Sequence, residues 1–394
     1  MLPLSGLRII AVEQYGAGPF GSMLLADLGA EVIKVENPAE GGDVSRSVGP
    51  HFFSDGDSHF FQAFNRNKKS LTLNLKNPRA TAVLHKLVRT ADATYDNLRG
   101  DQPEKLGLTY AALRETNPRI VCAHLSAYGR TGPRKSWPGY DYLMQAEAGY
   151  LSLTGEPDGP PSRMGLSVVD LMTGVTAGLA LVSAVLSART TGKGRDIDVN
   201  LFDTALQNLC YLAVWNLNAG VNQGREPRSS HPSLTPSQLY RTRDGFIFLM
   251  CNKEKFWPAL CEAIGRPQWS TRPEYKDFKA RLANRAKLTE ELDAALSERT
   301  TAEWIELFAG RVPAAPVYDV QGALESPFVT QGGRLRTAEH PSGPIRLLGS
   351  PITCAGEETP CAAGPALGAD TDAVLEEAGY SAADIADLRA AGAV

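Results

Sequence analysis

Residues 7–36 read LRIIAVEQYGAGPFGSMLLADLGAEVIKVE, and this stretch decides the fold class. The apolar runs at 7–12 and 31–35 each predict a buried strand. Pro19 stands near the start of the segment between them, where a helix tolerates proline, so residues 19–28 are expected to be helical. A strand, a helix and a second strand in this order predict a βαβ unit with two parallel strands.

Further strand and helix patterns alternate beyond this unit. Strands are expected at 71–75, 93–95, 120–125 and 196–199, and helices at 79–89, 110–115, 170–189 and 201–218. Repeated βα units cover both faces of a sheet with helices. The sequence therefore predicts an α/β fold, with a Rossmann-like, mostly parallel sheet and helices on both of its faces.

A change of composition divides the chain. Gly, Asn, Ser, Arg and Pro concentrate at 219–236, which predicts a linker. Asp244-Gly245 between two apolar runs then indicates a β-hairpin, and helical patterns complete a smaller α+β domain at 237–325. We expect 1–218 to form the N-terminal part of the large domain, and 326–394 to return to that domain.

Charge and composition exclude several classes of protein. The net charge of −4 gives no basic surface for nucleic acid or for an anionic membrane. The chain has no run of 18 apolar residues and no signal-peptide pattern at its start. The six cysteines and six histidines are dispersed and predict no metal site. We therefore expect a soluble, cytoplasmic protein with neither a nucleic-acid partner nor a membrane partner.

The glycines at 16, 18 and 21 form a motif with two interpretations. They follow a predicted strand and open a helix, and Glu36 closes the next strand about twenty residues further on. This pattern matches the dinucleotide fingerprint, in which an acid binds a ribose hydroxyl. An NAD-dependent oxidoreductase is therefore one alternative, and a structural turn with close helix–strand packing is the other.

Asp170 interrupts an apolar stretch, GLSVVDLMTG at 165–174, directly before an Ala-rich and Leu-rich helix. Burial of a charge without a partner is costly, so such a carboxylate is paired, neutralised or functional. Aspartate is also a frequent helix N-cap. The local pattern leaves both capping and catalysis open for Asp170.

Eight further segments accompany Asp170 along the chain. They are LSGLRII at 4–10, LGAEVIKVE at 28–36, GRTGP at 129–133, GYD at 139–141, TGEPDGPP at 154–161, GKGR at 192–195, PAAPV at 313–317 and LGADTDAVLEEAGY at 367–380. In this order they resemble, nearly end to end, the family III coenzyme A transferases, which include formyl-CoA and carnitine-CoA transferases. The resemblance implies that Asp170 is the nucleophile and that the protein is an interlocked, ring-like homodimer.

The resemblance also implies how coenzyme A is bound. CoA arrives as a thioester substrate, and no cofactor is expected to stay bound permanently. By motif position the CoA contacts are assigned to Gly16, Asn37, Leu73, Asn97, Leu98, Arg99, Lys105, Leu106 and Tyr128. Arg99 and Lys105 bracket the Gly100-Asp101 turn and could bind a phosphate group. Asn37 stands where formyl-CoA transferase has an arginine, which puts one CoA contact in doubt.

Tyr140 distinguishes the transferases from racemases of the same fold. The racemases place a histidine immediately before the aspartate of GYD, whereas this chain has Tyr140, a poor base near neutral pH. His124, a nearby alternative base, lies inside a predicted strand. An acyl-CoA racemase, the oxidoreductase and a non-catalytic acyl-CoA-binding protein remain the alternatives to a CoA transferase.

The substrates are expected to be an acyl-CoA and a small carboxylic or sulfinic acid. We expect succinyl-CoA as the donor and a C4–C5 dicarboxylate, or an analogue such as 3-sulfinopropionate, as the acceptor. Tyr140 and Arg163 are assigned to this substrate, because a guanidinium binds a remote carboxylate or sulfinate in a bidentate manner. The segment 250–253 contains no glycine, which argues against the loop that covers formate or oxalate in formyl-CoA transferase.

Overall fold

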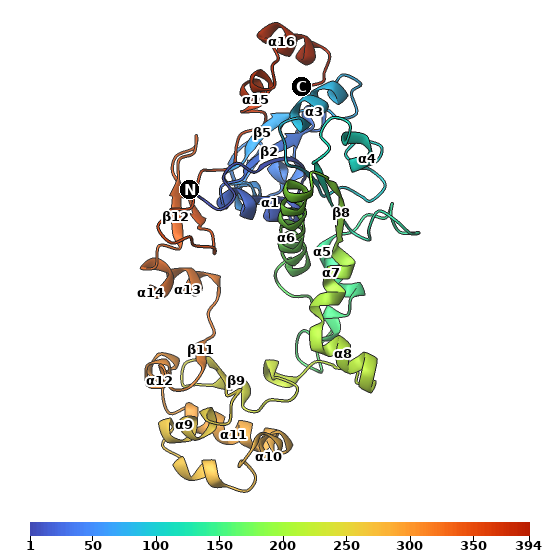
Figure 1. Ribbon diagram of the computed structural model, residues 1–394. Coiled ribbons are helices and arrows are strands. Elements are labelled where there is room, and N and C mark those ends of the chain that lie inside the picture. The colour runs from blue at the N-terminus through green and yellow to red at the C-terminus, as the bar shows by residue number, and fades with distance from the viewer. The chain divides into compact units, whose positions relative to one another are not determined.

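The computed structural model describes all 394 residues and divides into two compact units (Figure 1). Unit 1 consists of Met1–Ala148, Gly165–Cys210 and Phe328–Val394. Unit 2 consists of Gly149–Met164 and Tyr211–Pro327. The chain therefore leaves unit 1 twice and returns to it twice.

A six-stranded parallel sheet forms the centre of unit 1. Its strands are β1 Arg8–Val12, β2 Glu31–Glu36, β5 Lys69–Thr72, β6 Ala93–Asp96, β7 Val121–Ser126 and β8 Arg195–Asn200. They lie in the order β5-β2-β1-β6-β7-β8, and every neighbouring pair is parallel. The prediction of a Rossmann-like α/β fold from the βαβ pattern is confirmed.

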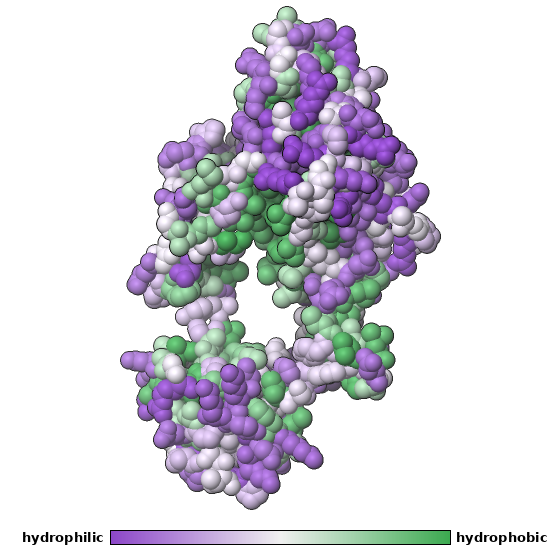
Figure 2. Space-filling view, in the orientation of Figure 1, coloured by the Kyte–Doolittle hydropathy of each residue, from purple (hydrophilic) through white to green (hydrophobic).

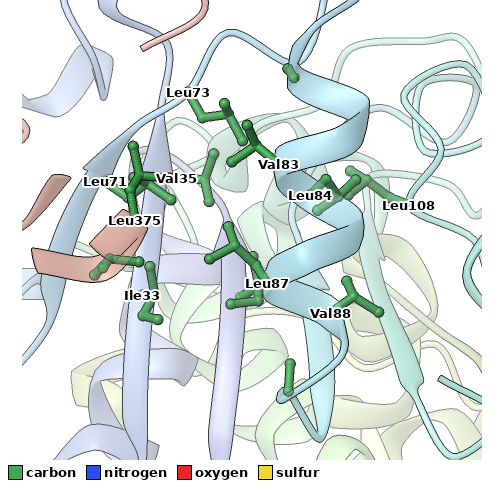
Figure 3. Close-up of a cluster of buried hydrophobic side chains, with 14 of the residues drawn as sticks. Ile33, Val35, Leu71, Leu73, Val83, Leu84, Leu87, Val88, Leu108 and Leu375 are labelled. Carbon is green, nitrogen blue, oxygen red and sulfur yellow. The ribbon is translucent and has the colours of Figure 1, made fainter. Parts of the chain in front are cut away.

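One face of the sheet packs against α3, Ala80–Val88 (Figure 3). Val83, Leu84, Leu87 and Val88 line one side of this helix, at the spacing of an amphipathic helix. They meet Ile33, Val35 and Leu71 from the strands, Leu73 just after β5, and Leu375 from α15, Thr371–Glu377. Each fully buried side chain of this kind contributes about 1.5–3 kcal/mol. The cluster thus fixes the C-terminal segment to the N-terminal half of the sheet.

Helices α1, Ala17–Asp27, and α6, Val168–Thr191, pack against each other through glycines. A Cβ atom at Gly21 would lie 2.5 Å from the carbonyl oxygen of Gly174. A Cβ atom at Gly174 would lie 2.5 Å from the carbonyl oxygen of Ala17. Only glycine at both positions permits so close an approach, which brings the start of α1 against the start of α6.

Helix α6 has 24 residues and is apolar and long enough to cross a membrane, judged by length and composition alone. In the structure it packs on α1, β7 and β8 as a helix of unit 1. The helix predicted at 170–189 is confirmed, and the structure extends it by two residues at each end.

The predicted helix at 201–218 is wrong in one respect. It divides into α7, Leu201–Asn208, and α8, Cys210–Ala219. Cys210 has a φ of 46°, in the left-handed region that L-residues avoid, so it cannot continue a right-handed helix. The boundary between the two units falls at this break.

Two segments belong to unit 2, although the sequence placed residues 149–164 in the large domain and 219–236 in a linker. Hydrogen bonds explain their position. The Arg225 guanidinium donates to the carbonyl oxygens of Gly159 and Pro160, at 2.6 and 2.8 Å. The Arg228 amide donates to the Glu156 carboxylate at 2.9 Å.

Unit 2 contains an antiparallel sheet in the order β11-β10-β9. Its elements are β9 Ser237–Arg241, β10 Phe246–Met250, α9 Phe256–Ala263, α10 Phe278–Ala283, α11 Arg285–Leu296, α12 Thr301–Phe308, β11 Ala314–Pro316 and α13 Val320–Glu325. Trp257 and Trp304 are buried in its core. The hairpin predicted at Asp244-Gly245 joins β9 to β10.

The remaining elements lie around the sheet of unit 1, apart from α14, which spans the return from unit 2. They are β3 Phe52–Ser54, β4 Asp57–Ser58, α2 His59–Phe64, α4 Tyr110–Leu113, α5 Asp141–Glu147, α14 Pro327–Thr330, β12 Leu335–Ala338, β13 Ile345–Leu348 and α16 Ala382–Ala390. Of these, α2 and α5 contribute residues near the candidate site.

The glycine contact between α1 and α6 can be tested with a matched pair of substitutions. We expect Gly174→Ala to lower the free energy of unfolding by about 1–3 kcal/mol, because its methyl group has no room against a backbone carbonyl. Gly178→Ala lies one turn further along α6, and its Cβ would meet nothing closer than 3.7 Å. That control should stabilise the helix, by about 0.5–1 kcal/mol. Urea unfolding in which both variants behave alike would contradict the packing argument.

Candidate active site

Asp170 lies in the first turn of α6 with a half-buried carboxyl group. No protein group donates a hydrogen bond to its side-chain oxygens. A Cβ atom at Gly16 would lie 2.9 Å from Asp170 Oδ2, so the carboxylate faces the backbone that opens α1. The structure therefore brings together Asp170 and Gly16, whose roles as nucleophile and CoA contact stay predictions.

Asp141 caps α6, and Asp170 does not. Asp141 Oδ2 accepts hydrogen bonds from the amides of Val169 and Asp170, at 2.7 and 3.0 Å. Gln145 donates to the other oxygen of Asp141 and fixes its orientation. The capping role that the sequence left open for Asp170 is thus filled by a residue of α5. The Asp170 side chain remains free for chemistry.

Burial raises the pKa of Asp170, and the nearby charge of Asp141 raises it further, to about 7. Both effects disfavour the ionised form. This value lies well above that of an ordinary aspartate, which is about 3.9. Asp170 therefore changes its charge nearer neutral pH than an ordinary aspartate does.

The start of α1, which follows Gly16, leaves backbone amides unpaired. The N–H groups of Ala17 and Gly18 donate to no backbone acceptor, and Pro19 has no N–H group. Free amides at a helix N-terminus carry partial positive charge. They are suited to stabilise an oxyanion that develops on a carbonyl next to Asp170.

The loop before α1 is held on two sides. Asn97 accepts a hydrogen bond from the Gln14 amide at 2.9 Å and donates to the Gln14 carbonyl at 2.7 Å. Asp43 accepts from the Tyr15 amide at 3.0 Å and pairs with the buried Lys34 ammonium at 2.8 Å. The Asn97 carboxamide, which was assigned to CoA, is therefore occupied by the loop backbone.

A cavity of about 250 Å³ opens at the carboxyl ends of β1, β2, β5 and β6. Its apolar lining consists of Val12, Val35, Leu73, Leu75, Leu98 and Leu106, and Asn37, Lys76 and Gln102 add polar groups. Four predicted CoA contacts line this cavity, namely Asn37, Leu73, Leu98 and Leu106. Ligands of open α/β sheets bind at this edge, and an apolar slot suits a flat base.

Arg99 and Lys105 lie in the segment that supplies Leu98 and Leu106, but neither is a lining residue of the cavity. Both pair with Asp101, at 3.1 and 2.6 Å. The hydrogen bond from the Lys105 ammonium is the main reason why the pKa of Asp101 lies below its usual value. A phosphate group would have to compete with Asp101 for these two exposed cations.

Glu36 is not available to a ribose hydroxyl. Arg46 donates to both of its carboxylate oxygens, at 2.8 and 2.7 Å, and Ser70 donates at 2.6 Å. The glycine motif is explained instead by the contact of α1 with α6. The dinucleotide interpretation therefore loses the acid on which it depended.

Tyr128 lies apart from the cavity. Its hydroxyl donates to Glu147 at 2.8 Å, and its ring meets Trp137 edge-on at a centroid distance of 6.1 Å.

Tyr140 directly precedes α5, and its ring meets that of Tyr15 edge-on at a centroid distance of 6.3 Å. Arg163 belongs to unit 2 and donates to the Met164 carbonyl, so its role at the second anion stays a prediction.

His124 is buried in β7 and bonded at both ring nitrogens, to Asp96 at 2.6 Å and to Asp196 at 3.0 Å. Burial lowers the pKa of His124, but the hydrogen bonds to Asp196 and Asp96 outweigh this effect and raise it to about 9. A protonated histidine without a free nitrogen cannot act as a racemase base.

No group of three or more His, Cys, Asp or Glu side chains is placed to hold a metal ion.

Sequence reasoning missed three residues of the site: Gln14, Lys76 and Asp141. Gln14 directly follows β1, at the edge of the sheet where ligands bind, and that position is a usable signal. Lys76 follows β5 at the same edge and pairs with Glu40 at 2.8 Å. Asp141 stood out only as part of the GYD motif, and its capping role gave no signal, because the helix that it caps begins 27 residues later in the chain.

Comparisons with known proteins agree with this geometry. Residues 4–371 match the CoA-transferase family III. A succinyl-CoA:mesaconate CoA-transferase of Haloarcula marismortui is 36% identical, over 95% of this chain and 96% of that protein. The succinyl-CoA:glutarate CoA-transferase of Homo sapiens is 32% identical, over 100% of this chain and 90% of that protein. The crystal structure of a CAIB/BAIF family protein from Brucella suis has 30% identity and a TM-score of 0.82, over 96% of this chain and 99% of that chain.

The family match spans nearly the whole sequence, and the two relatives are CoA-transferases matched over at least nine tenths of both chains. This chain therefore belongs to the CoA-transferase family III, and it is an enzyme that transfers coenzyme A.

Proposed function

We propose that the enzyme moves CoA from succinyl-CoA to a C4–C5 dicarboxylic acid, or to an analogue such as 3-sulfinopropionate, through a thioester on Asp170. One observation carries this proposal. The Asp170 carboxylate has no hydrogen-bond partner and faces Gly16 at the start of α1, because Asp141 takes over the capping of α6.

The reaction has four steps, each of which forms one bond and breaks one. An Asp170 oxygen attacks the thioester carbonyl of succinyl-CoA and expels the CoA thiolate, which leaves a mixed anhydride. The thiolate attacks the aspartyl carbonyl, forms the aspartyl-CoA thioester and releases succinate. The acceptor carboxylate attacks this thioester and expels the thiolate again. The thiolate then attacks the acceptor carbonyl, which yields the new acyl-CoA and frees Asp170.

The surroundings of Asp170 suit these steps. The free amides of Ala17 and Gly18 can donate to the oxyanion of each tetrahedral intermediate, and a preorganised donor of this kind is worth about 3–4 kcal/mol. Partial burial keeps the anhydride away from water. The apolar cavity at the sheet edge accepts the base of CoA, while Lys76 lies at its rim for a phosphate group.

The names of the relatives support the substrate class. Both relatives use succinyl-CoA as the donor and a dicarboxylic acid with five carbons as the acceptor, mesaconate in one and glutarate in the other. The segment 250–253 contains no glycine, which argues against the loop that covers formate in formyl-CoA transferase.

Racemisation is disfavoured, because His124 is bonded at both nitrogens and Tyr140 is a poor base near neutral pH.

The covalent route predicts a substrate-dependent adduct on Asp170. Incubation with succinyl-CoA should add CoA to the wild-type chain, and hydroxylamine should release it and inactivate the enzyme. Asp170→Ala should carry no adduct and should lose transfer to mesaconate or glutarate by at least about a thousandfold. Intact-mass spectrometry and urea unfolding provide the readouts. A folded Asp170→Ala variant with more than roughly one percent of wild-type activity would rule out Asp170 as the nucleophile.

The raised pKa of Asp170 predicts a pH profile. Protonated Asp170 cannot attack, so kcat/KM should fall about tenfold for each pH unit below its pKa of about 7. Asp141→Asn removes the neighbouring charge and keeps an oxygen that accepts from the α6 amides. The acid limb should then move to lower pH, by roughly one unit. An unchanged limb in a variant of normal stability would contradict the charge effect of Asp141.

The enzyme is further proposed to be a homodimer. Three apolar side chains on one face of α6 are exposed, namely Val175, Leu179 and Leu186, by 45%, 69% and 68%. Hydrophobic surface is visible in the region where Figure 1 draws this helix (Figure 2). A second copy of the chain would remove this surface from water, as is typical of obligate homodimers. Light scattering should give the mass of two chains, and Leu179→Arg should shift it toward one. A wild-type mass of one chain would exclude the dimer.

A further inference from the structure

We propose that Tyr15 and Tyr140 form an aromatic wall beside Asp170 that holds the carbon chain of the substrate acid, and that Tyr15 is a specificity-determining residue. This inference rests on the proposed transfer of CoA through Asp170. It adds a physical reason why the enzyme prefers acids with a longer carbon chain.

Both tyrosines directly precede a residue that contacts Asp170. Tyr15 is followed by Gly16, whose Cβ position lies 2.9 Å from Asp170 Oδ2. Tyr140 is followed by Asp141, which accepts a hydrogen bond from the Asp170 amide at 3.0 Å. Consecutive Cα atoms are about 3.8 Å apart, so both rings start within one residue of the nucleophile.

The two rings form one continuous surface. They meet edge-on with centroids 6.3 Å apart, a preferred geometry for aromatic pairs. Phe60 of α2 packs edge-on against the other side of Tyr15 at 5.4 Å, and Phe64 packs behind Phe60 at 5.1 Å. Tyr15 and Tyr140 are 38% and 61% exposed, so part of each ring is open to a ligand.

Tyr15 is held in a backbone conformation that L-residues avoid. Its φ of 70° lies in the left-handed region, which favours glycine. Asp43 binds the Tyr15 amide, and Asn97 binds both backbone groups of Gln14, so the surrounding structure enforces this conformation. Strain of this kind persists mainly at functional sites. A glycine would satisfy the backbone better, which indicates that the Tyr15 ring itself is used.

The electrostatics point to contact with the carbon chain of the acid. Asp170 has no salt bridge, and no basic group is among the causes that shift its pKa. The one charged neighbour that shifts its pKa is the acidic Asp141 of α5. The wall therefore recognises the apolar part of the acid by burial against the rings. The chemical class that fits is an acid with three or more carbons beyond the reacting carboxyl group, unsaturated or branched chains included.

The backbone of Tyr15 allows a clean test. Tyr15→Gly removes the ring and leaves a residue that adopts a φ of 70° without strain. Tyr15→Phe keeps the ring and removes the hydroxyl group. With succinyl-CoA as the donor, kcat/KM would be measured for acetate, glutarate and mesaconate with both variants and with Tyr140→Ala.

We expect Tyr15→Gly to lower kcat/KM for glutarate and mesaconate by about tenfold, chiefly through KM, and to leave acetate within about twofold. The KM for succinyl-CoA should rise as well, because the succinyl chain uses the same wall. Tyr15→Phe should lose far less than Tyr15→Gly with the longer acids, because it keeps the ring. The double variant with Tyr140→Ala should lose less than the product of the two single losses, because both rings hold one chain.

Two outcomes would overturn the inference. Equal losses for acetate and for the longer acids would mean that Tyr15 only shapes the loop, and a loss in Tyr15→Phe equal to that in Tyr15→Gly would mean that the hydroxyl group, not the ring, is used. In either case the aspartyl adduct still forms on Asp170 with succinyl-CoA. A missing adduct in the wild type would instead refute the proposed function, so the two failures are distinguishable.

Discussion

The contact between α1 and α6 is the constraint on which the site depends. Two helices approach until a Cβ atom at Gly21 or Gly174 would overlap a backbone carbonyl of the other helix. This spacing sets the first turn of α6 against the backbone that opens α1, and it places the Asp170 carboxylate at Gly16. Larger side chains at the contact would keep the two helices further apart. They would also separate the carboxylate from the amides that can stabilise an oxyanion.

The distribution of buried charge follows from the same arrangement. Lys34 pairs with Asp43, and Arg46 pairs with Glu36, so most buried charges near the sheet edge are neutralised. Asp170 is left without a partner, and Asp141 adds a second negative charge beside it. Such an arrangement costs stability, because an unpaired buried carboxylate is disfavoured. It persists where the unpaired group performs chemistry, as at a nucleophile.

The sequence predicted those features that depend on local pattern. The βαβ unit at 7–36 gave the parallel sheet, and the motif series gave Asp170 together with the family. Features that depend on tertiary contacts could not be read in this way. Asp141 caps a helix that is distant in the chain, and Cys210 breaks a segment whose apolar periodicity looked continuous. Tyr128 was assigned by motif position alone, and its side chain is bonded to Glu147, apart from the cavity.

The raised pKa of Asp170 has a chemical consequence on the proposed route. The mixed anhydride offers the thiolate two carbonyl groups, and each attack expels a different carboxylate. Attack on the aspartyl carbonyl expels the substrate acid, whose free carboxyl group has a pKa near the usual value of about 4.3. Attack on the acyl carbonyl expels Asp170, whose pKa is about 7. The conjugate base of the stronger acid is the better leaving group, a rule that also governs thiol exchange. On the proposed route this difference favours expulsion of the substrate acid from the first anhydride. The last step must instead expel Asp170 from the acceptor anhydride, so the acceptor carbonyl has to be positioned for attack by the thiolate.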